Sequence, residues 1–397
     1  MGCTRRTPIR FAMTCMALNA MALCFAASAC AESVIAVGQL NEPRMGHTAT
    51  LLADGRVLLV NGQYAGSAEI YDPLTRGFHR TAPPAIAERY LHAAALLPNG
   101  HVLVVGGTDG KGAMWRAAER YDPVNDRWHA VPPLAFGRIS PKAISLADGR
   151  VLVSGGYPYQ AEIYDPVTDA WSLASAMMTH RTQGGVALMP DGRVLHAGGK
   201  GDAAFEYPTT AEVYNPLVNG WMFTTSMQFP RVDDAIPLGD GRIMMAGSAG
   251  SGFAIADAEA YDPRTATWSP IAPLPAPRAA YAATRLRDGN ALVAGGNAIQ
   301  YVQSATDTLF VYEFASNRWR TAGTLTGVRS GASATLLRTG EVLIAGGGDA
   351  NGPLMWADLY VPDGVEPQAV PSLSIMSTLV LIVLLAVAGY WRNYRFQ

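Results

Sequence analysis

Beyond residue 30 the chain contains no cysteine. All four of its cysteines, Cys3, Cys15, Cys24 and Cys30, lie in the first thirty residues. The remainder of the chain therefore has no disulfide framework, no Cys-ligated zinc or iron–sulfur site, and no cysteine nucleophile.

The chain also has few charged residues, 16% against 49% hydrophobic residues, and its two ends lack acidic side chains altogether. Arg5, Arg6 and Arg10 lie at the N-terminus, and Arg392 and Arg395 at the C-terminus; apart from these, 25 basic side chains remain against 32 acidic ones. An acidic body lacks the basic surface that nucleic acids require. The apolar content excludes a disordered chain. We therefore predict a folded domain and no nucleic-acid partner.

The N-terminus has the three parts of a secretory signal peptide. Three arginines precede an apolar stretch at residues 11–29, and Ala27-Ser28-Ala29 and Ala29-Cys30-Ala31 are both A-x-A cleavage patterns. We predict a signal peptide at residues 1–31 and secretion across the inner membrane. Two alternatives are an uncleaved N-terminal anchor and lipid attachment at Cys30, because residues 27–30 resemble a bacterial lipobox without its usual leucine.

Residues 373–391 are largely apolar and uncharged, and a helix of this length crosses a bilayer. The arginines that follow predict a basic cytoplasmic tail at residues 392–397 and a body outside the membrane. We expect a transmembrane helix at residues 373–391, preceded by a linker at residues 362–372.

The end of this linker, Val370-Pro371-Ser372-Leu373, followed by an apolar helix and a basic tail, resembles the IPTL-CTERM sorting signals of Gram-negative surface proteins. Met376-Ser377 stands where that family usually has Trp-Gly. The resemblance implies an exosortase-like membrane peptidase as a partner, removal of the tail, and delivery to the cell surface or the extracellular space. A permanent membrane anchor is the alternative.

Between the two ends, one pattern occurs seven times. Each copy has a strand of small residues, an Asp-Gly turn or its equivalent, an apolar strand ending at glycine, a variable loop, and a tyrosine that usually stands in Ala-Glu-x-Tyr-Asp-Pro. The turns are Asp54-Gly55, Asn99-Gly100, Asp148-Gly149, Asp191-Gly192, Asp240-Gly241, Asp288-Gly289 and Thr339-Gly340, and the tyrosines are Tyr71, Tyr121, Tyr164, Tyr214, Tyr261, Tyr312 and Tyr360. An aromatic residue follows in six copies, at Phe78, Trp128, Trp171, Trp221, Trp268 and Trp319.

This repeat resembles the bacterial kelch repeat over residues 33–361. The resemblance implies an all-β fold, a seven-bladed β-propeller in which each blade is a four-stranded antiparallel meander. No aromatic residue follows Tyr360, so the seventh copy lacks its last two strands. Because residues 34–40 align with residues 319–325, we predict that residues 33–52 complete the last blade together with residues 341–361. Closure by the N-terminal strands removes an open sheet edge.

Within this fold, the variable loops are expected on one face and the uniform turns on the other, and loops on a rigid frame usually carry specificity. One arginine per copy is also expected on the loop face: Arg44, Arg89, Arg138, Arg181, Arg231, Arg278 and Arg329. Such a ring can bind a carboxylate or sulfate of a ligand. Alternatively, each arginine pairs with a carboxylate of a neighbouring blade or caps backbone carbonyls, and the regular spacing favours this structural role.

Asp233-Asp234, beside Arg231, is the strongest local departure from the repeat. Paired carboxylates support acid–base chemistry, or remain solvated in a loop. The histidines have no metal-ligand spacing, and the chain has no P-loop, dinucleotide-binding fingerprint or nucleophile elbow, so we predict no metal and no cofactor. A galactose-oxidase-like copper site is excluded because it requires a cysteine cross-linked to tyrosine.

We predict an exported, surface-directed binding protein that recognises a protein or a glycan through its loop face. The alternative is a carbohydrate-active propeller enzyme, resembling sialic-acid mutarotase or a lyase, that uses the axial pocket. The two are distinguished by whether Arg231, Asp233, Asp234, Glu206 or the histidines converge on one cavity.

The C-terminal tail provides the first test. If a peptidase recognises residues 370–373, the mature surface form ends near Pro371, and replacing Pro371 and Leu373 by alanine leaves full-length chain in the inner membrane. If the helix is only a membrane anchor, these replacements leave the location and length of the chain unchanged, because apolar length alone holds a helix in the bilayer. Mass spectrometry of the native protein, from a host that encodes such a peptidase, decides between the two. An intact C-terminus at Gln397 contradicts the sorting signal.

Overall fold

The computed structural model describes residues 31–87, 89–202, 206–248, 253–299 and 304–367. The predicted signal peptide, apart from Ala31, lies outside these ranges, as do the sorting motif, the predicted transmembrane helix and the basic tail. The described residues form 30 β-strands and no α-helix, so none of their elements is a helix that could cross a membrane.

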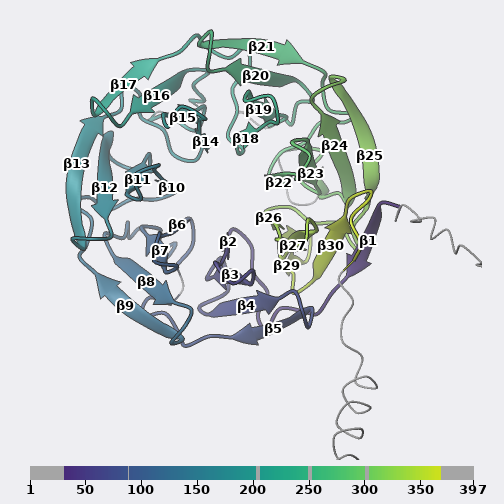
Figure 1. Cartoon of the computed structure of the whole chain (residues 1–397), viewed down its shortest axis with the longest axis horizontal. Helices are drawn as coiled ribbons and strands as arrows, with labels where there is room; N and C mark the ends of the chain where they lie inside the picture. The colour runs from purple at the N-terminus through teal and green to yellow at the C-terminus, as the bar shows by residue number, and fades with distance from the viewer. Residues whose placement is uncertain (1–30, 88, 203–205, 249–252, 300–303, 368–397) are drawn as a thin grey trace, which may run out of the picture.

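Seven four-stranded antiparallel sheets stand as blades around one axis, which confirms the predicted all-β, seven-bladed propeller (Figure 1). From the axis outward, blade one is β2 (Thr48–Leu51), β3 (Val57–Val60), β4 (Ala68–Asp72) and β5 (Gly77–Arg80), and blade two is β6 (Ala93–Leu96), β7 (Val102–Val105), β8 (Ala118–Asp122) and β9 (Arg127–Val131). Blade three is β10 (Lys142–Ser145), β11 (Val151–Ser154), β12 (Gln160–Asp165) and β13 (Ala170–Ala176), and blade four is β14 (Gly185–Leu188), β15 (Val194–Ala197), β16 (Ala211–Asn215) and β17 (Gly220–Phe223). Blade five is β18 (Ile236–Pro237), β19 (Ile243–Ala246), β20 (Ala258–Asp262) and β21 (Thr267–Ile271), and blade six is β22 (Ala282–Arg285), β23 (Ala291–Ala294), β24 (Thr308–Glu313) and β25 (Arg318–Thr324). Blade seven is β26 (Ser333–Leu336), β27 (Val342–Ala345), β30 (Ala357–Val361) and β1 (Ser33–Ala36), and a small hairpin, β28 (Gly348–Asp349) with β29 (Gly352–Pro353), extends from it.

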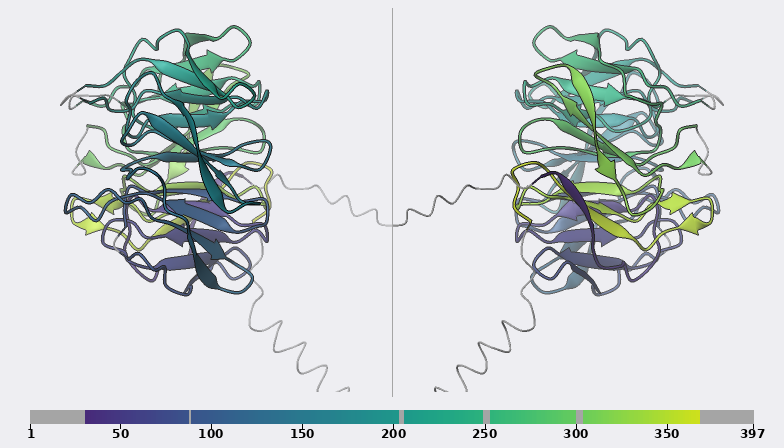
Figure 2. Two further views of the ribbon diagram at one scale, coloured as in Figure 1. Left: turned by 90° about the vertical axis from the view of Figure 1, so that its left-hand side faces the viewer. Right: turned by 90° about the vertical axis from the view of Figure 1, so that its right-hand side faces the viewer.

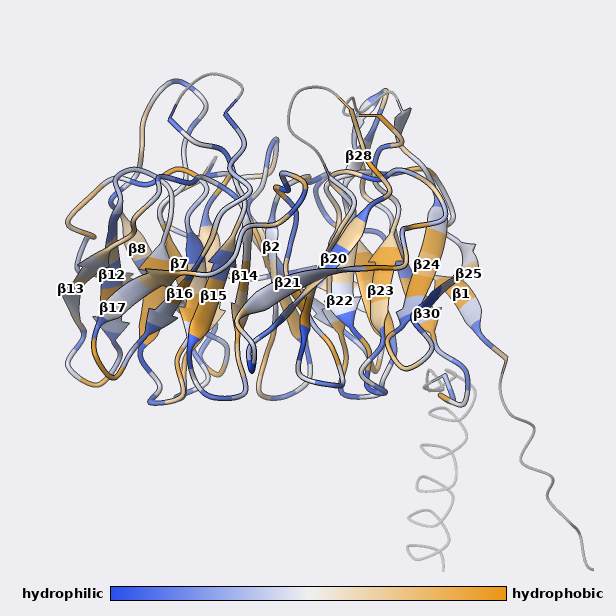
Figure 3. Cartoon of the chain, turned by 90° about the horizontal axis from the view of Figure 1, so that it is seen from above, coloured by the Kyte–Doolittle hydropathy of each residue, from blue (hydrophilic) through white to orange (hydrophobic). Residues whose placement is uncertain are grey.

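The second strand of each blade is apolar along its whole length because both of its faces are buried. In β3, Val57 and Leu59 pack toward blade seven, while Leu58 and Val60 pack toward blade two. The hydrophobic core is thus divided into clusters that lie between neighbouring blades, and Figure 3 shows the apolar residues concentrated in these inner strands.

The repeated tyrosine and the aromatic residue after it are part of this scaffold. In six blades the two rings pack tilted, with centroids 5.0 to 5.4 Å apart. The indole of Trp128 also donates to the carbonyl oxygen of Ala82 in the preceding blade, at 2.8 Å, and Trp171 donates to that of Pro132 at 2.7 Å. Each pair therefore packs between two sheets, and the tryptophan of the five pairs that have one also joins them by a hydrogen bond.

The ring closes in blade seven, where β1 pairs antiparallel with β30 from Ser33↔Val361 to Ala36↔Asp358. The prediction that residues 33–52 supply two strands of this blade was wrong. Residues 48–51 form β2, which pairs with β3 through the tight turn at Asp54-Gly55 and therefore belongs to blade one. Because the small-residue strand is the innermost strand of its own blade, blade seven takes its innermost strand from β26, and the N-terminus contributes only β1.

Both ends of the described chain leave from the turn face. The backbone N–H of Glu32 donates to Asp363 Oδ1 at 2.7 Å, and Glu32 also pairs with Arg320. The variable loops and the β28–β29 hairpin extend from the opposite face (Figures 2 and 3).

The closure predicts that the ring depends on a single short strand. Deletion of Ser33–Ala36 exposes the edge of β30, and we expect aggregation or loss of the cooperative unfolding transition. Thermal unfolding and size-exclusion chromatography measure both effects. A soluble, monomeric deletion variant with an unchanged melting temperature contradicts closure through β1.

Candidate functional site

The loop that enters each blade carries the arginine that the repeat predicts. Six of the seven are fully buried, with 0% of their surface exposed, and Arg278 is 4% exposed. Each of the six pairs with the carboxylate of its own blade's third strand: Arg44 with Glu69 at 2.6 Å, Arg89 with Glu119 at 2.9 Å, Arg138 with Glu162 at 2.8 Å, Arg181 with Glu212 at 2.8 Å, Arg231 with Glu259 at 2.9 Å, and Arg329 with Asp358 at 2.7 Å.

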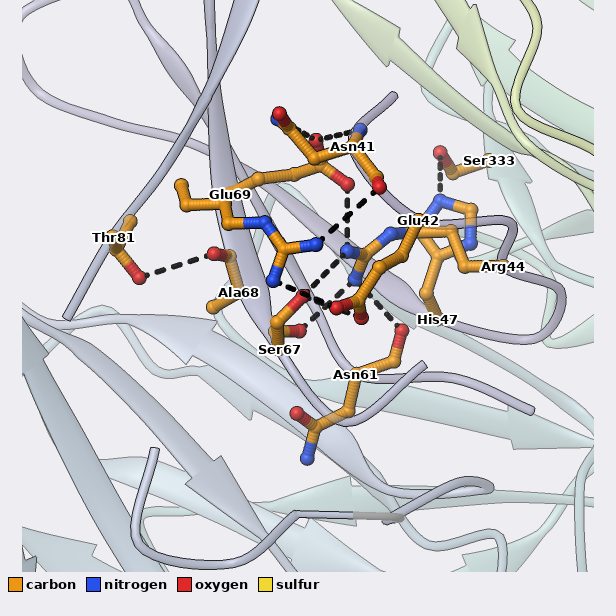
Figure 4. Close-up of polar contacts among 11 residues, drawn as sticks. Asn41, Glu42, Arg44, His47, Asn61, Ser67, Ala68, Glu69, Thr81 and Ser333 are labelled. Atoms are coloured by element: carbon orange, nitrogen blue, oxygen red, sulfur yellow. Dashed lines mark hydrogen bonds and ion pairs between the residues drawn. The ribbon is translucent and has the colours of Figure 1, made fainter. Parts of the chain in front are cut away.

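Arg44 shows how the guanidinium is used (Figure 4). Its Nη1 donates to the carbonyl oxygens of Asn61 and Ser67 at 2.9 and 3.1 Å, while its Nη2 faces Glu69. The other oxygen of Glu69 accepts the backbone N–H of Asn41 at 2.8 Å. These contacts correspond to the structural alternative, with one correction: the carboxylate comes from the same blade and not from a neighbouring one.

Blade six replaces the ion pair with a different contact. Phe310 stands where other repeats have the acidic residue, and the Arg278 guanidinium lies over its ring, 5.0 Å from the centroid. A cation over an aromatic face is a weaker but still favourable interaction. The arginine ring is thus part of the scaffold in all seven blades.

The axis of the ring opens on the loop face as a pocket of about 390 Å³. Its polar lining includes Lys142, Gln183, Lys200, Asp233, Asp234 and Asn297, together with His47 and His92. Lys142, Gly185 and Ala93 each begin the innermost strand of their blade, the position closest to the axis.

Two charged residues of the pocket, Lys142 from blade three and Asp234 from the loop that enters blade five, form an ion pair. Lys142 Nζ lies 2.8 Å from Asp234 Oδ1, and their side chains are 30% and 59% exposed. Gly185 begins the innermost strand of blade four, which stands between blades three and five. A Cβ added to Gly185 would lie 2.6 Å from the backbone nitrogen of Ala235 and 3.0 Å from the carbonyl oxygen of Asp233. A glycine at this position therefore lets blade five come close enough for the ion pair.

The adjacent carboxyls of the pocket differ in acidity. Asp233 Oδ1 accepts the backbone N–H of Ala280 in blade six at 3.1 Å. Loss of hydration, reinforced by the neighbouring Asp234 carboxylate, raises the pKa of Asp233 to about 7. The ammonium of Lys142 instead lowers the pKa of Asp234. One group is thus able to hold a proton near neutral pH while its neighbour is ionised, as acid–base chemistry requires.

The pocket brings together only some of the predicted site residues. Asp233, Asp234, His47 and His92 line it, whereas Arg231 is buried in its ion pair and Glu206 does not line the pocket. His47 Nε2 lies 2.8 Å from Ser333 Oγ, and His92 Nε2 lies 2.9 Å from Thr48 Oγ1, so each imidazole joins neighbouring blades. Burial lowers the pKa of His92 to about 3, which keeps the ring neutral.

Lys142 was not predicted as a site residue. The sequence did contain an indication: a lysine stands where other repeats carry small residues, such as Thr48, Ala93 or Ala282. What the sequence did not show was that this position faces the axis, because that depends on which strand of the blade is innermost.

The ion pairs generate a stability prediction. Glu212→Gln leaves the Arg181 charge buried without its partner, so we expect a loss of about 3–5 kcal/mol of unfolding free energy. Asp54→Asn is the matched control, since the Asp54–Arg56 pair is exposed and should contribute at most about 1 kcal/mol. Chemical unfolding measures both. Equal effects of the two variants contradict the structural role of the buried pairs.

Asp233 generates a pH prediction. Its pKa is about 7 in the folded chain against an ordinary value of 3.8, so the folded state holds this proton more tightly than the unfolded state. Its contribution to stability is complete below the ordinary value and is lost as the pH rises through about 7. The Asp233→Asn side chain cannot ionise. As the pH rises from about 4 to 8, the melting temperature of the wild type should therefore fall relative to that of the variant. Parallel curves for the two proteins contradict the raised pKa.

Comparison with known proteins agrees with the geometry. The kelch motif family model matches residues 89–135, and no curated protein matches the chain. A fungal alcohol oxidase of the AA5 family, solved in complex with copper, matches with a TM-score of 0.67 and 15% identity over 83% of this chain and 76% of its own. That likeness shows the fold alone. In the described part of this chain, no group of three His, Cys, Asp or Glu residues is placed so that it could hold a metal ion. The chain is thus a seven-bladed β-propeller, and residues 89–135, which include most of blade two, match the kelch motif.

Proposed function

We propose that the chain is an exported binding protein that holds its ligand in the axial pocket of the loop face. The observation that carries the proposal is the placement of Lys142, Asp233 and Asp234. At these three positions the other repeats have no lysine, arginine, aspartate or glutamate; examples are Ala93 for Lys142, Gly46 for Asp233 and Tyr281 for Asp234. Lys142 and Asp234 also expose charge to solvent at the axis. The rest of the repeat is explained by packing, ion pairs and closure, whereas charges in an open pocket serve recognition.

The orientation of the propeller supports display at the cell surface. The ends of the described chain meet on the turn face through Glu32 and Asp363. If the predicted C-terminal helix anchors the protein, the turn face lies nearer the membrane and the loop face points away from it. The axial pocket then remains open to a ligand before and after the predicted removal of the tail.

The alternative is a carbohydrate-active enzyme, and Asp233 is the observation that favours it. A carboxyl with a pKa of about 7 in a water-accessible pocket is suited to general acid or base catalysis. An enzyme loses turnover but keeps substrate binding when Asp233 is replaced by asparagine. A binding protein shows no turnover of any ligand that it captures.

The binding proposal is tested with the full-length chain on an array that displays glycans and peptides. We expect Lys142→Ala and Asp234→Asn to weaken the captured signal about tenfold or more, because both charges line the pocket. Arg264→Ala is the matched control, since Arg264 is an exposed arginine paired with Asp262 on the turn face. Folded Lys142 and Asp234 variants that bind as well as the wild type contradict the proposal.

A further inference from the structure

A second polar cluster lies on the loop face, over blades three and four. It consists of Tyr157 and Tyr159 from the loop before β12, His180 from the loop that enters blade four, and Asp202 from the loop after β15. Asp202 Oδ1 accepts from the Tyr157 hydroxyl at 3.1 Å and lies 2.7 Å from His180 Nδ1. Asp202 Oδ2 accepts from the Tyr159 hydroxyl at 2.6 Å.

These contacts fix two aromatic rings that remain open to solvent. Tyr157 is 45% exposed and Tyr159 is 41% exposed, whereas His180 is 3% exposed. The His180 ring supports both, with centroids 4.3 Å from Tyr157 and 5.4 Å from Tyr159. Both hydroxyls are held by Asp202, so the orientation of the two exposed rings is fixed. Rings that are already ordered lose little conformational entropy when a ligand binds.

The cluster adjoins the axial pocket. Thr182 and Lys200 exchange two backbone hydrogen bonds, each 2.9 Å long, and this bridge lies two residues from His180 and from Asp202. Lys200 and Gln183 line the pocket itself. A ligand seated at the axis can therefore continue over this bridge onto the two tyrosines without leaving the protein surface.

We propose that Tyr157 and Tyr159 form a stacking platform for a sugar ring, and that the ligand of the axial pocket is a neutral oligosaccharide. The C–H groups of a pyranose face carry partial positive charge and complement the negative face of an aromatic ring. The Asp202 carboxylate has acceptor capacity left for a sugar hydroxyl. The proposal deepens the proposed function and rests on it.

The charges of the pocket favour a neutral sugar over an anionic one. Lys142 is paired with Asp234, and the charge of Lys200 is offset by Asp233, which is partly ionised at neutral pH, and by Asp202, two residues along the chain. Gln183 and Asn297 add amides that both donate and accept. Such a lining satisfies hydroxyl groups and carries little net charge. A peptide containing proline also stacks on tyrosine, and it is the rival outcome of the test.

The test uses the full-length chain in a sugar-free detergent, titrated with maltohexaose, cellohexaose and mannohexaose by saturation-transfer NMR. We expect at least one hexasaccharide to bind, with Tyr159→Ala about tenfold weaker. Tyr159→Phe keeps the ring and should bind within about threefold of the wild type. Tyr64→Ala is the matched control, because Tyr64 is a 74% exposed tyrosine in the variable loop of blade one, and it should leave binding unchanged.

The variants separate this inference from the pocket on which it rests. Binding that is lost in Lys142→Ala but kept in Tyr159→Ala overturns the platform and supports the pocket. Binding that is lost in Tyr159→Ala but kept in Lys142→Ala supports the platform and overturns the pocket. If none of the three sugars binds, or if a proline-rich peptide binds in a manner that depends on Tyr159 while the sugars do not, the oligosaccharide proposal is overturned.

Discussion

The buried pair between an arginine and the carboxylate of its own blade is the interaction on which the rest of the propeller depends. It ties the loop that enters a blade to the third strand of that blade, and the same guanidinium holds loop carbonyls such as those of Asn61 and Ser67. Both charges are desolvated, so removing either one leaves the other buried and uncompensated. Six blades have the ion pair, and in blade six the Arg278 guanidinium over the Phe310 ring takes its place. The loop face is therefore a fixed surface on which other residues are free to differ.

The axial pocket follows from that fixed frame. Since every blade presents the start of its innermost strand to the axis, a single substitution there changes the chemistry of a shared cavity. Lys142 and Asp234 form an ion pair across blade four because Gly185 leaves room for the backbone of blade five. The hydroxyl contacts of His47 and His92 tie the same region together from blades one and two. The pocket is thus a property of the assembled ring and of no single repeat.

The seven-bladed fold could be predicted because the turn, the terminal glycine, the tyrosine and the tryptophan repeat at fixed offsets. The composition of blade seven could not, since the alignment of residues 34–40 with 319–325 identifies the outer strand but not which strand is innermost. The sequence suggested two roles for the repeated arginines, ligand binding and structural pairing. The acidic residue two positions before six of the seven tyrosines, such as Glu212 before Tyr214, indicated the structural role. The Tyr157–Tyr159 platform was not predictable, because its partners, His180 and Asp202, come from two other loops that the fold brings together.

The central claim is that the uniform residues build the ring while the departures from uniformity at the axis bind the ligand. Hydrogen–deuterium exchange of the full-length chain, with and without a saturating neutral hexasaccharide, tests it most directly. The account predicts that protection is confined to the loop face, at residues 140–142, 157–160, 180–183, 200–202 and 232–234, while the turns around Asp54 and Asp148 exchange as before. Protection on the turn face, with none at the axis, would contradict it.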